Sequence, residues 1–210
     1  MSKRFLVVSA LIAATLMIAG LLVVDRPLVL AIHASAFENL PFCVDGLQFL
    51  DTIFGMHVSY WLAPSVCLML GLLALFLSSR KQLSRRFAIA VFSAGLVQAA
   101  TIGLMMLGKN SFGRMRPLDL LASGDWSVQW FAGGGSFPSG HSSFYFGLFL
   151  PLAAAAPRVW QRIGLLVLPM FAISARLDTS KHFLSDVAAS ALVAACVALL
   201  VTTLLRRRLA

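Results

Sequence analysis

The class of fold is decided by residues 5–24, which read F-L-V-V-S-A-L-I-A-A-T-L-M-I-A-G-L-L-V-V. This run has no charged residue, and its length matches the roughly 20 apolar residues that a helix needs to cross a bilayer core. Lys3 and Arg4 precede it. A cleaved signal peptide also places basic residues before an apolar run, but its run is shorter and ends in a small-residue cleavage site. No such site separates this run from Asp25, so we expect a retained membrane helix.

The rest of the chain has the same character, since 60% of the 210 residues are hydrophobic and only 12% are charged. This composition is far from that of a soluble globular domain. We predict an all-α integral membrane protein, a six-helix transmembrane bundle that forms a single domain over residues 1–210. The predicted spans are approximately residues 5–24, 60–77, 87–107, 137–156, 161–176 and 187–205.

Residues 25–58, between the first two spans, mix polar and apolar side chains. The apolar runs 28–32 and 47–50 are too short to span, and they predict short amphipathic helices that lie at the membrane interface. His33 and His57 fall in this segment, where we expect them to pack rather than to catalyse. The three cysteines show no spacing typical of a disulfide or a metal site.

The net charge of +9 raises the possibility of nucleic-acid binding, but the distribution of the charges indicates a membrane topology instead. Eleven of the 17 basic residues lie at the two termini and in two alternate turns: Lys3, Arg4, Arg80, Lys81, Arg85, Arg86, Arg158, Arg162 and Arg206 to Arg208. The positive-inside rule makes that side cytoplasmic. All eight acidic residues fall on the other side: Asp25, Glu38, Asp45, Asp51, Asp119, Asp125, Asp178 and Asp186. We therefore predict a multi-pass protein of a bacterial-type inner membrane, with both termini cytoplasmic and no nucleic-acid partner.

Three polar segments interrupt the apolar chain at the ends of predicted spans. They are Lys109–Pro117 (K-N-S-F-G-R-M-R-P), Pro138–His141 (P-S-G-H) and Arg176–Asp186 (R-L-D-T-S-K-H-F-L-S-D). The predicted topology places all three on the non-cytoplasmic side. Ionisable residues beside membrane spans are costly and usually functional, so we expect the three segments to form one site.

The first polar segment supplies cations. If the third span's helix continues to Arg116 and ends at Pro117, Lys109 and Arg116 are nearly two turns apart and share a face. Two or three cations on one face suit the oxygens of a phosphoryl group. Arg114 is expected at the rim of this site. The alternative interpretation is a set of basic residues that extend to the membrane surface.

The second polar segment predicts an anion site at the start of a helix. Free backbone N–H groups and the helix dipole favour an anion there, the hydroxyl of Ser139 adds a donor, and Gly140 allows close approach of the backbone. His141, in the first turn, is placed to exchange a proton with a bound group. The alternative is a helix cap with an incidental histidine.

The third polar segment pairs a histidine with a carboxylate. His182 and Asp186 are four residues apart, which on a helix puts the carboxylate beside the imidazole and fixes its tautomer. Arg176, at the end of the fifth span, can reach the same pocket. The alternative is a local capping pair.

The order K-x6-R-P, P-S-G-H, R-x5-H-x3-D resembles the type-2 phosphatidic acid phosphatase family, whose soluble relatives are vanadium haloperoxidases and bacterial acid phosphatases. The third motif of that family usually opens with Ser-Arg, whereas Ala175 precedes Arg176 here. The resemblance implies that His182 is a nucleophile that forms a phosphohistidine, that Asp186 orients it, and that His141 is the acid and then the base. It assigns the stabilisation of the transition state to Lys109, Arg116, Ser139, the Gly140 amide and Arg176, with no cofactor and no metal.

The predicted function is hydrolysis of a phosphomonoester or pyrophosphate on a lipid headgroup, with membrane lipids as the partners. Phosphatidylglycerol phosphate, phosphatidic acid, undecaprenyl pyrophosphate and lipid A phosphates all present a suitable group. Two alternatives remain open. A phosphotransferase would move phosphate from a polyprenyl pyrophosphate to another lipid, and a small anion transporter would use the cations for binding, although transporters usually place such groups near mid-membrane in paired repeats.

Overall fold

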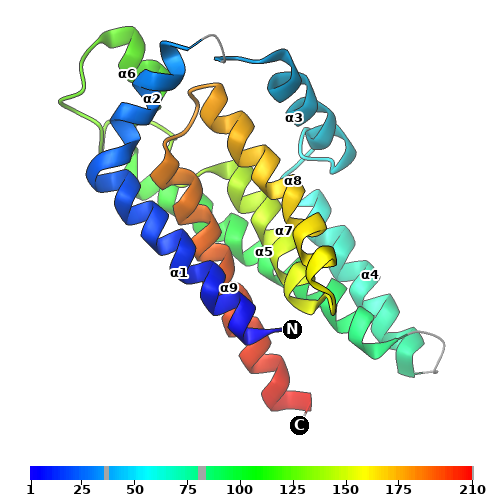
Figure 1. Cartoon of the computed structure of the whole chain (residues 1–210). Helices are drawn as coiled ribbons and strands as arrows, with labels where there is room; N and C mark the ends of the chain where they lie inside the picture. Colours follow the sequence, from blue (N-terminus) through cyan, green and yellow to red (C-terminus); the bar gives the residue numbers. More distant parts are fainter. Residues whose placement is uncertain (36–37, 80–83, 210) are drawn as a thin grey trace.

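The computed structural model describes residues 1–35, 38–79 and 84–209. For residues 206–209 it describes the helical backbone but not the side chains. The described residues form helices and no strand, which confirms the all-α prediction (Figure 1). In chain order the elements are α1 (Lys3–Ala19), the π-helix η1 (Gly20–Val24), α2 (Asp25–His33), α3 (Pro41–Ile53), α4 (Leu62–Ser79), α5 (Arg85–Phe112), α6 (Pro117–Ser123), α7 (Gly140–Ala155), α8 (Val159–Asp178) and α9 (Leu184–Leu209).

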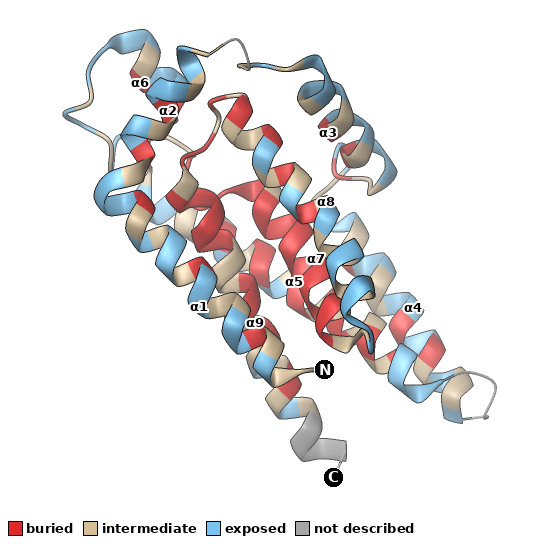
Figure 2. Ribbon diagram, in the orientation of Figure 1, coloured by how far each residue is buried: buried red, intermediate tan, exposed pale blue. Residues whose placement is uncertain are grey.

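The long helices run side by side with α7 at the centre, in contact with α5, α8 and α9 (Figure 1). A helix that is apolar around its whole circumference is expected to be buried. Nearly every residue of α7 from Gly140 to Ala154 is buried, and its ribbon is almost entirely red in Figure 2. The two termini lie at one end of the bundle (Figure 1). Arg80 and Lys81, and the side chains of Arg206 to Arg208, lie outside the described residues.

Four helical segments are long and apolar enough to cross a membrane: Lys3–His33, Leu62–Ser79, Arg85–Ser123 and Leu184–Leu205. The predicted count of six is not confirmed, because α7 and α8 are not among them. α7 has only 16 residues, fewer than the roughly 20 that cross a bilayer core. The outward faces of the bundle nevertheless carry large exposed apolar side chains such as Leu11, Met69 and Val167, which suits contact with lipid.

The first span differs from the prediction at its end. The helix does not stop at Val24, because the π-turn η1 joins α1 to α2 and the helical segment runs on to His33. The short helix predicted over residues 28–32 forms as α2, but it continues the first helical segment instead of standing apart from it, and its place at the membrane interface stays a prediction. Tight packing accompanies the π-turn, since a Cβ added at Gly20 would lie 2.8 Å from the Ser185 nitrogen. The other short helix is confirmed as a helix, because α3 covers residues 47–50 and begins at Pro41, and proline is favoured as the first helical residue. Its position at the membrane interface stays a prediction.

The end of α5 also differs from the prediction. α5 stops at Phe112, where Gly113 caps it in the left-handed region with φ 49°, a conformation that glycine adopts at no steric cost. Arg116 is extended (ψ 152°), because the residue before a proline is disfavoured in the helical region. Pro117 therefore begins α6 instead of ending α5. Lys109 and Arg116 do not share a helix face.

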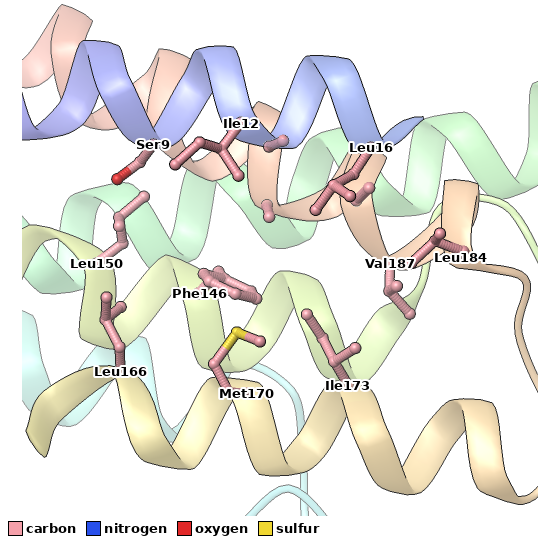
Figure 3. A pocket seen from close by; sticks show the side chains of 13 residues that line it. Ser9, Ile12, Leu16, Phe146, Leu150, Leu166, Met170, Ile173, Leu184 and Val187 are labelled. Carbon is pink, nitrogen blue, oxygen red and sulfur yellow. The ribbon is translucent and has the colours of Figure 1, made fainter. Parts of the chain in front are cut away.

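An apolar cavity of about 310 Å³ lies between α1, α7, α8 and α9 (Figure 3). Ser9 is the only polar residue among those that line it; Leu16, Phe146, Met170 and Val187 project into it in the figure. Such a lining suits hydrocarbon and not a phosphate. The chemistry must therefore lie elsewhere.

Candidate active site

The three polar segments meet at the end of the bundle opposite the termini (Figure 1). Lys109 is in the last turn of α5 and Arg176 is in the last turn of α8, while Arg116 precedes α6. The three cations lie close enough to repel one another electrostatically. Like charges held together in a partly buried place are costly without a bound anion. The structure therefore brings together the cations that the sequence predicted, although not on one helix.

The individual cations are held differently. The Lys109 ammonium donates to the carbonyl oxygen of Gly135, which lies in the loop before α7. The Arg176 Nε is buried and has no hydrogen-bond partner among the described residues. An unpaired buried guanidinium N–H is unfavourable, so this donor is available to an anion.

The second polar segment opens α7, with Ser139 as the N-cap residue and Gly140 as the first helical residue. The Ser139 Oγ accepts from the Ser142 hydroxyl at 3.0 Å, which leaves the Ser139 hydroxyl hydrogen able to donate. Gly140 packs closely, since an added Cβ would lie 2.9 Å from the hydroxyl oxygen of Tyr60. The cap position of Ser139 and its free hydroxyl hydrogen fit the predicted anion site at a helix N-terminus, whereas Gly140 has no side chain because Tyr60 leaves no room for one.

His182 lies in the loop before α9, not on the helix as the spacing suggested, because α9 begins at Leu184. Its Nδ1 donates to the carbonyl oxygen of Ser136 at 2.8 Å, and its side chain is only 2% exposed. A carbonyl can only accept, so Nδ1 carries the hydrogen and Nε2 keeps a lone pair. Burial lowers the pKa of His182 to about 4, and Arg176 and Lys109 act in the same direction while Asp186 opposes them. The imidazole is therefore neutral near pH 7, as a nucleophile requires.

Asp186 lies 3.7 Å from His182 Nδ1, which is beyond hydrogen-bond distance. Its carboxylate accepts instead from the Ser136 hydroxyl at 2.6 Å and from the backbone N–H of Phe183 at 2.8 Å. Ser136 thus contacts both residues, with its carbonyl on the imidazole and its hydroxyl on the carboxylate. The orienting role assigned to Asp186 remains a prediction, and the contacts connect Asp186 to His182 through Ser136.

Arg114 is buried at 2% exposure, so the expectation that it lies at the rim of the site is wrong. Its guanidinium donates to Asp186 at 2.6 Å and to Asp25 at 2.8 Å. The aromatic rings of Trp130 and Phe183 lie 4.5 Å and 3.9 Å from its Cζ. Two carboxylates and two ring faces compensate the free-energy cost of burying the cation. The sequence spacing did not show these partners.

His141 forms the second histidine–carboxylate pair. Its Nε2 lies 2.9 Å from Asp51 Oδ2, and the other carboxylate oxygen accepts from the Tyr145 hydroxyl at 2.8 Å. With Nε2–H donating to Asp51, Nδ1 is the nitrogen that can exchange a proton with a bound group. His141, Asp51 and Arg176 line a pocket of about 270 Å³ together with His57 and Lys181.

Sequence reasoning missed the partners of the two histidines and of Arg114. Asp51 and Asp25 were treated only as acidic residues of one membrane side, and Ser136 and Tyr145 were not considered. One signal could have found Asp51: it lies four residues after Leu47 on the buried face of α3, where a carboxylate needs a partner. Ser136 gives no such signal.

A model of the PAP2 superfamily matches residues 86–210, which is more than half of the chain. The chain belongs to the PAP2 superfamily. Membership indicates phosphatase activity on phosphate esters. Comparisons with curated proteins and with solved structures gave no match.

The PAP2 region contains all the site residues predicted from the sequence. Asp25 and Asp51 lie before it, on the segments that precede α4. The pairing of Asp25 with Arg114 and of Asp51 with His141 therefore links the N-terminal part of the chain to the PAP2 region.

Proposed function

We propose that this PAP2 protein is a membrane lipid phosphatase that hydrolyses a phosphate ester or pyrophosphate of a lipid headgroup through a phosphohistidine. The observation that carries the proposal is the pair of histidines with opposite free nitrogens beside three clustered cations. His182 presents a neutral Nε2 and His141 presents Nδ1. Such a pair divides the work of nucleophile and acid–base between two residues.

In the first step, the Nε2 lone pair of His182 attacks phosphorus and forms an N–P bond. The P–O bond to the lipid breaks, and His141 Nδ1 gives its proton to the leaving oxygen. In the second step, His141 accepts a proton from water, whose oxygen attacks phosphorus and breaks the N–P bond. Inorganic phosphate leaves and both histidines return to their starting states. Lys109, Arg116, Ser139, the Gly140 amide and Arg176 neutralise charge on the equatorial oxygens.

A lipid substrate is favoured because the cations lie at the ends of apolar helices, among them a candidate membrane span that carries Lys109. A headgroup phosphate rests near the depth at which such a helix leaves the hydrocarbon. The basic residues that the sequence places at the opposite end support an extracytoplasmic orientation of the site. An impermeant thiol reagent should label a cysteine introduced at Ser123 in intact spheroplasts and leave one at Ser84 unlabelled; the reverse would place the site in the cytoplasm.

The central test is phosphate release by the purified protein from the four candidate lipids, with His182→Ala as the control. Loss of the nucleophile should lower activity by at least about 1,000-fold. Activity should survive EDTA and be inhibited by orthovanadate, a five-coordinate mimic of the transition state. Dependence on added metal, or full activity of His182→Ala, would contradict the mechanism. Transfer of label to a second lipid without release of phosphate would indicate a phosphotransferase instead.

A further inference from the structure

The carboxylate that contacts His141 comes from outside the PAP2 region. Asp51 is in the last turns of α3, a helix whose main packing partner is α8 and which stands beside the upper ends of α4 and α8 (Figure 1). Ninety residues of sequence separate it from His141, yet the two side chains are 2.9 Å apart. A contact over such a separation depends on how α3 is seated.

The seating of Asp51 is specific. Both carboxylate oxygens are engaged, one by His141 and one by the Tyr145 hydroxyl, and the residue is 6% exposed. Phe54, at the end of α3, packs edge-on against Tyr145 and Phe149, with ring centroids 5.8 and 5.5 Å apart. The backbone N–H of Met56 also donates to the carbonyl of Asp51. A buried carboxylate held at both oxygens has a fixed direction.

The charges around His141 make this carboxylate important. The charged groups that act most strongly on its imidazole are Asp51 from α3, Lys109 from α5 and Arg176 from α8; Lys181 and His57 line the same pocket. Two of the three are cations and disfavour an imidazolium. Asp51 is the single anion of this set, so it is the group that allows His141 to hold the proton that the leaving oxygen needs.

We propose that Asp51 is a positioning residue for the general acid: it fixes His141 with Nε2–H toward α3 and Nδ1 toward the phosphate, and it stabilises the protonated ring. This inference rests on the proposed function. Asp51 does not touch the reacting atoms, and it acts through His141. The N-terminal part of the chain thereby completes an acid–base apparatus that the PAP2 region alone lacks.

The test compares two substrates of the same enzyme. Phosphatidic acid has a poor alkoxide leaving group that needs protonation, whereas 4-nitrophenyl phosphate has a good one that needs little. Asp51→Asn in the full-length protein should lower kcat on phosphatidic acid on the order of 100-fold, with KM little changed and a much smaller loss on the aryl phosphate. Activity on phosphatidic acid should also fall at a lower pH on the alkaline side than in the wild type, because the uncharged amide no longer holds the proton on His141.

Two further variants sharpen the result. Asp51→Glu keeps the charge and should recover part of the loss on phosphatidic acid. Asp45→Asn removes an exposed carboxylate from the same helix and should leave both activities unchanged. If Asp51→Asn fails to fold, Tyr145→Phe frees one carboxylate oxygen and should give a smaller loss of the same kind, greater on phosphatidic acid than on the aryl phosphate.

Equal losses on both substrates with an unchanged pH profile would show that Asp51 only supports the fold, and unchanged activity on both would show that it does nothing for His141. Either outcome overturns the inference. His182→Ala distinguishes this failure from failure of the proposed function. If His182→Ala is inactive while Asp51→Asn gives either of these outcomes, the phosphohistidine route still stands. An active His182→Ala would reject that route itself.

Discussion

The two histidines of the site differ in what surrounds them. His182 is 2% exposed and is held by a backbone carbonyl, beside a network of Ser136, Asp186, Arg114 and Asp25 that is buried throughout. His141 is 17% exposed, lines the pocket, and is held by one carboxylate from α3. A nucleophile must stay neutral and fixed, whereas an acid must both hold and release a proton. The buried surroundings of His182 suit a nucleophile, and the pocket-lining position of His141 suits an acid.

The largest expected effect comes from removing each histidine in turn. His182→Ala should lose at least about 1,000-fold on both a lipid phosphate and an aryl phosphate, because no covalent route remains. His141→Ala should lose roughly 100- to 10,000-fold on the lipid phosphate and less on the aryl phosphate, since only the former needs the acid. Phosphate release from both substrates measures this. If His141→Ala were inactive on both while His182→Ala kept aryl phosphatase activity, the two roles would be reversed.

The next effect concerns the buried network on the His182 side. Arg114→Met leaves Asp25 and Asp186 buried without their cation, which should cost about 3–5 kcal/mol of stability. Thermal unfolding of the detergent-solubilised protein measures the loss. Arg26→Met is a matched control, because Arg26 is exposed and stacks on Trp126 at 5.1 Å without a buried carboxylate. A stability loss no larger for Arg114→Met than for Arg26→Met would mean that the network does not hold this side of the site together.

The smallest effect concerns the protonation of the His182 ring, which we expect to leave activity unchanged near neutral pH. Because burial lowers the pKa of His182 to about 4, its ring should stay neutral as the pH falls from 7 to 5 and become protonated only near pH 4. The nucleophilic lone pair is lost at that point, so activity falls on the acid side of pH 4 and not near the ordinary value of about 6.5. Histidine-selective 15N labelling and NMR of the four histidines, with His182→Ala for assignment, measures this. Titration of His182 near pH 6.5 would contradict the buried environment.

Local sequence signals predicted the features that depend on near neighbours. A run without charges, such as residues 5–24, predicts a membrane helix whatever the rest of the chain does, and the helix forms there. Pro117 shows the limit of this reasoning. It was expected to end a helix but it begins one, because Gly113 had already ended α5 and a proline is favoured at a first helical position.

By itself the sequence determined that this is an apolar helical chain, that three polar segments interrupt it, and that those segments resemble the family to which the chain belongs. Only the tertiary structure decided which charges are paired. Arg114 meets Asp25 across 89 residues and His141 meets Asp51 across 90, and neither pair follows from any periodicity. The physical reason is that a charge inside a bundle is tolerated only where a partner is seated beside it, and the packing of α1, α2 and α3 against the PAP2 helices determines where those partners lie.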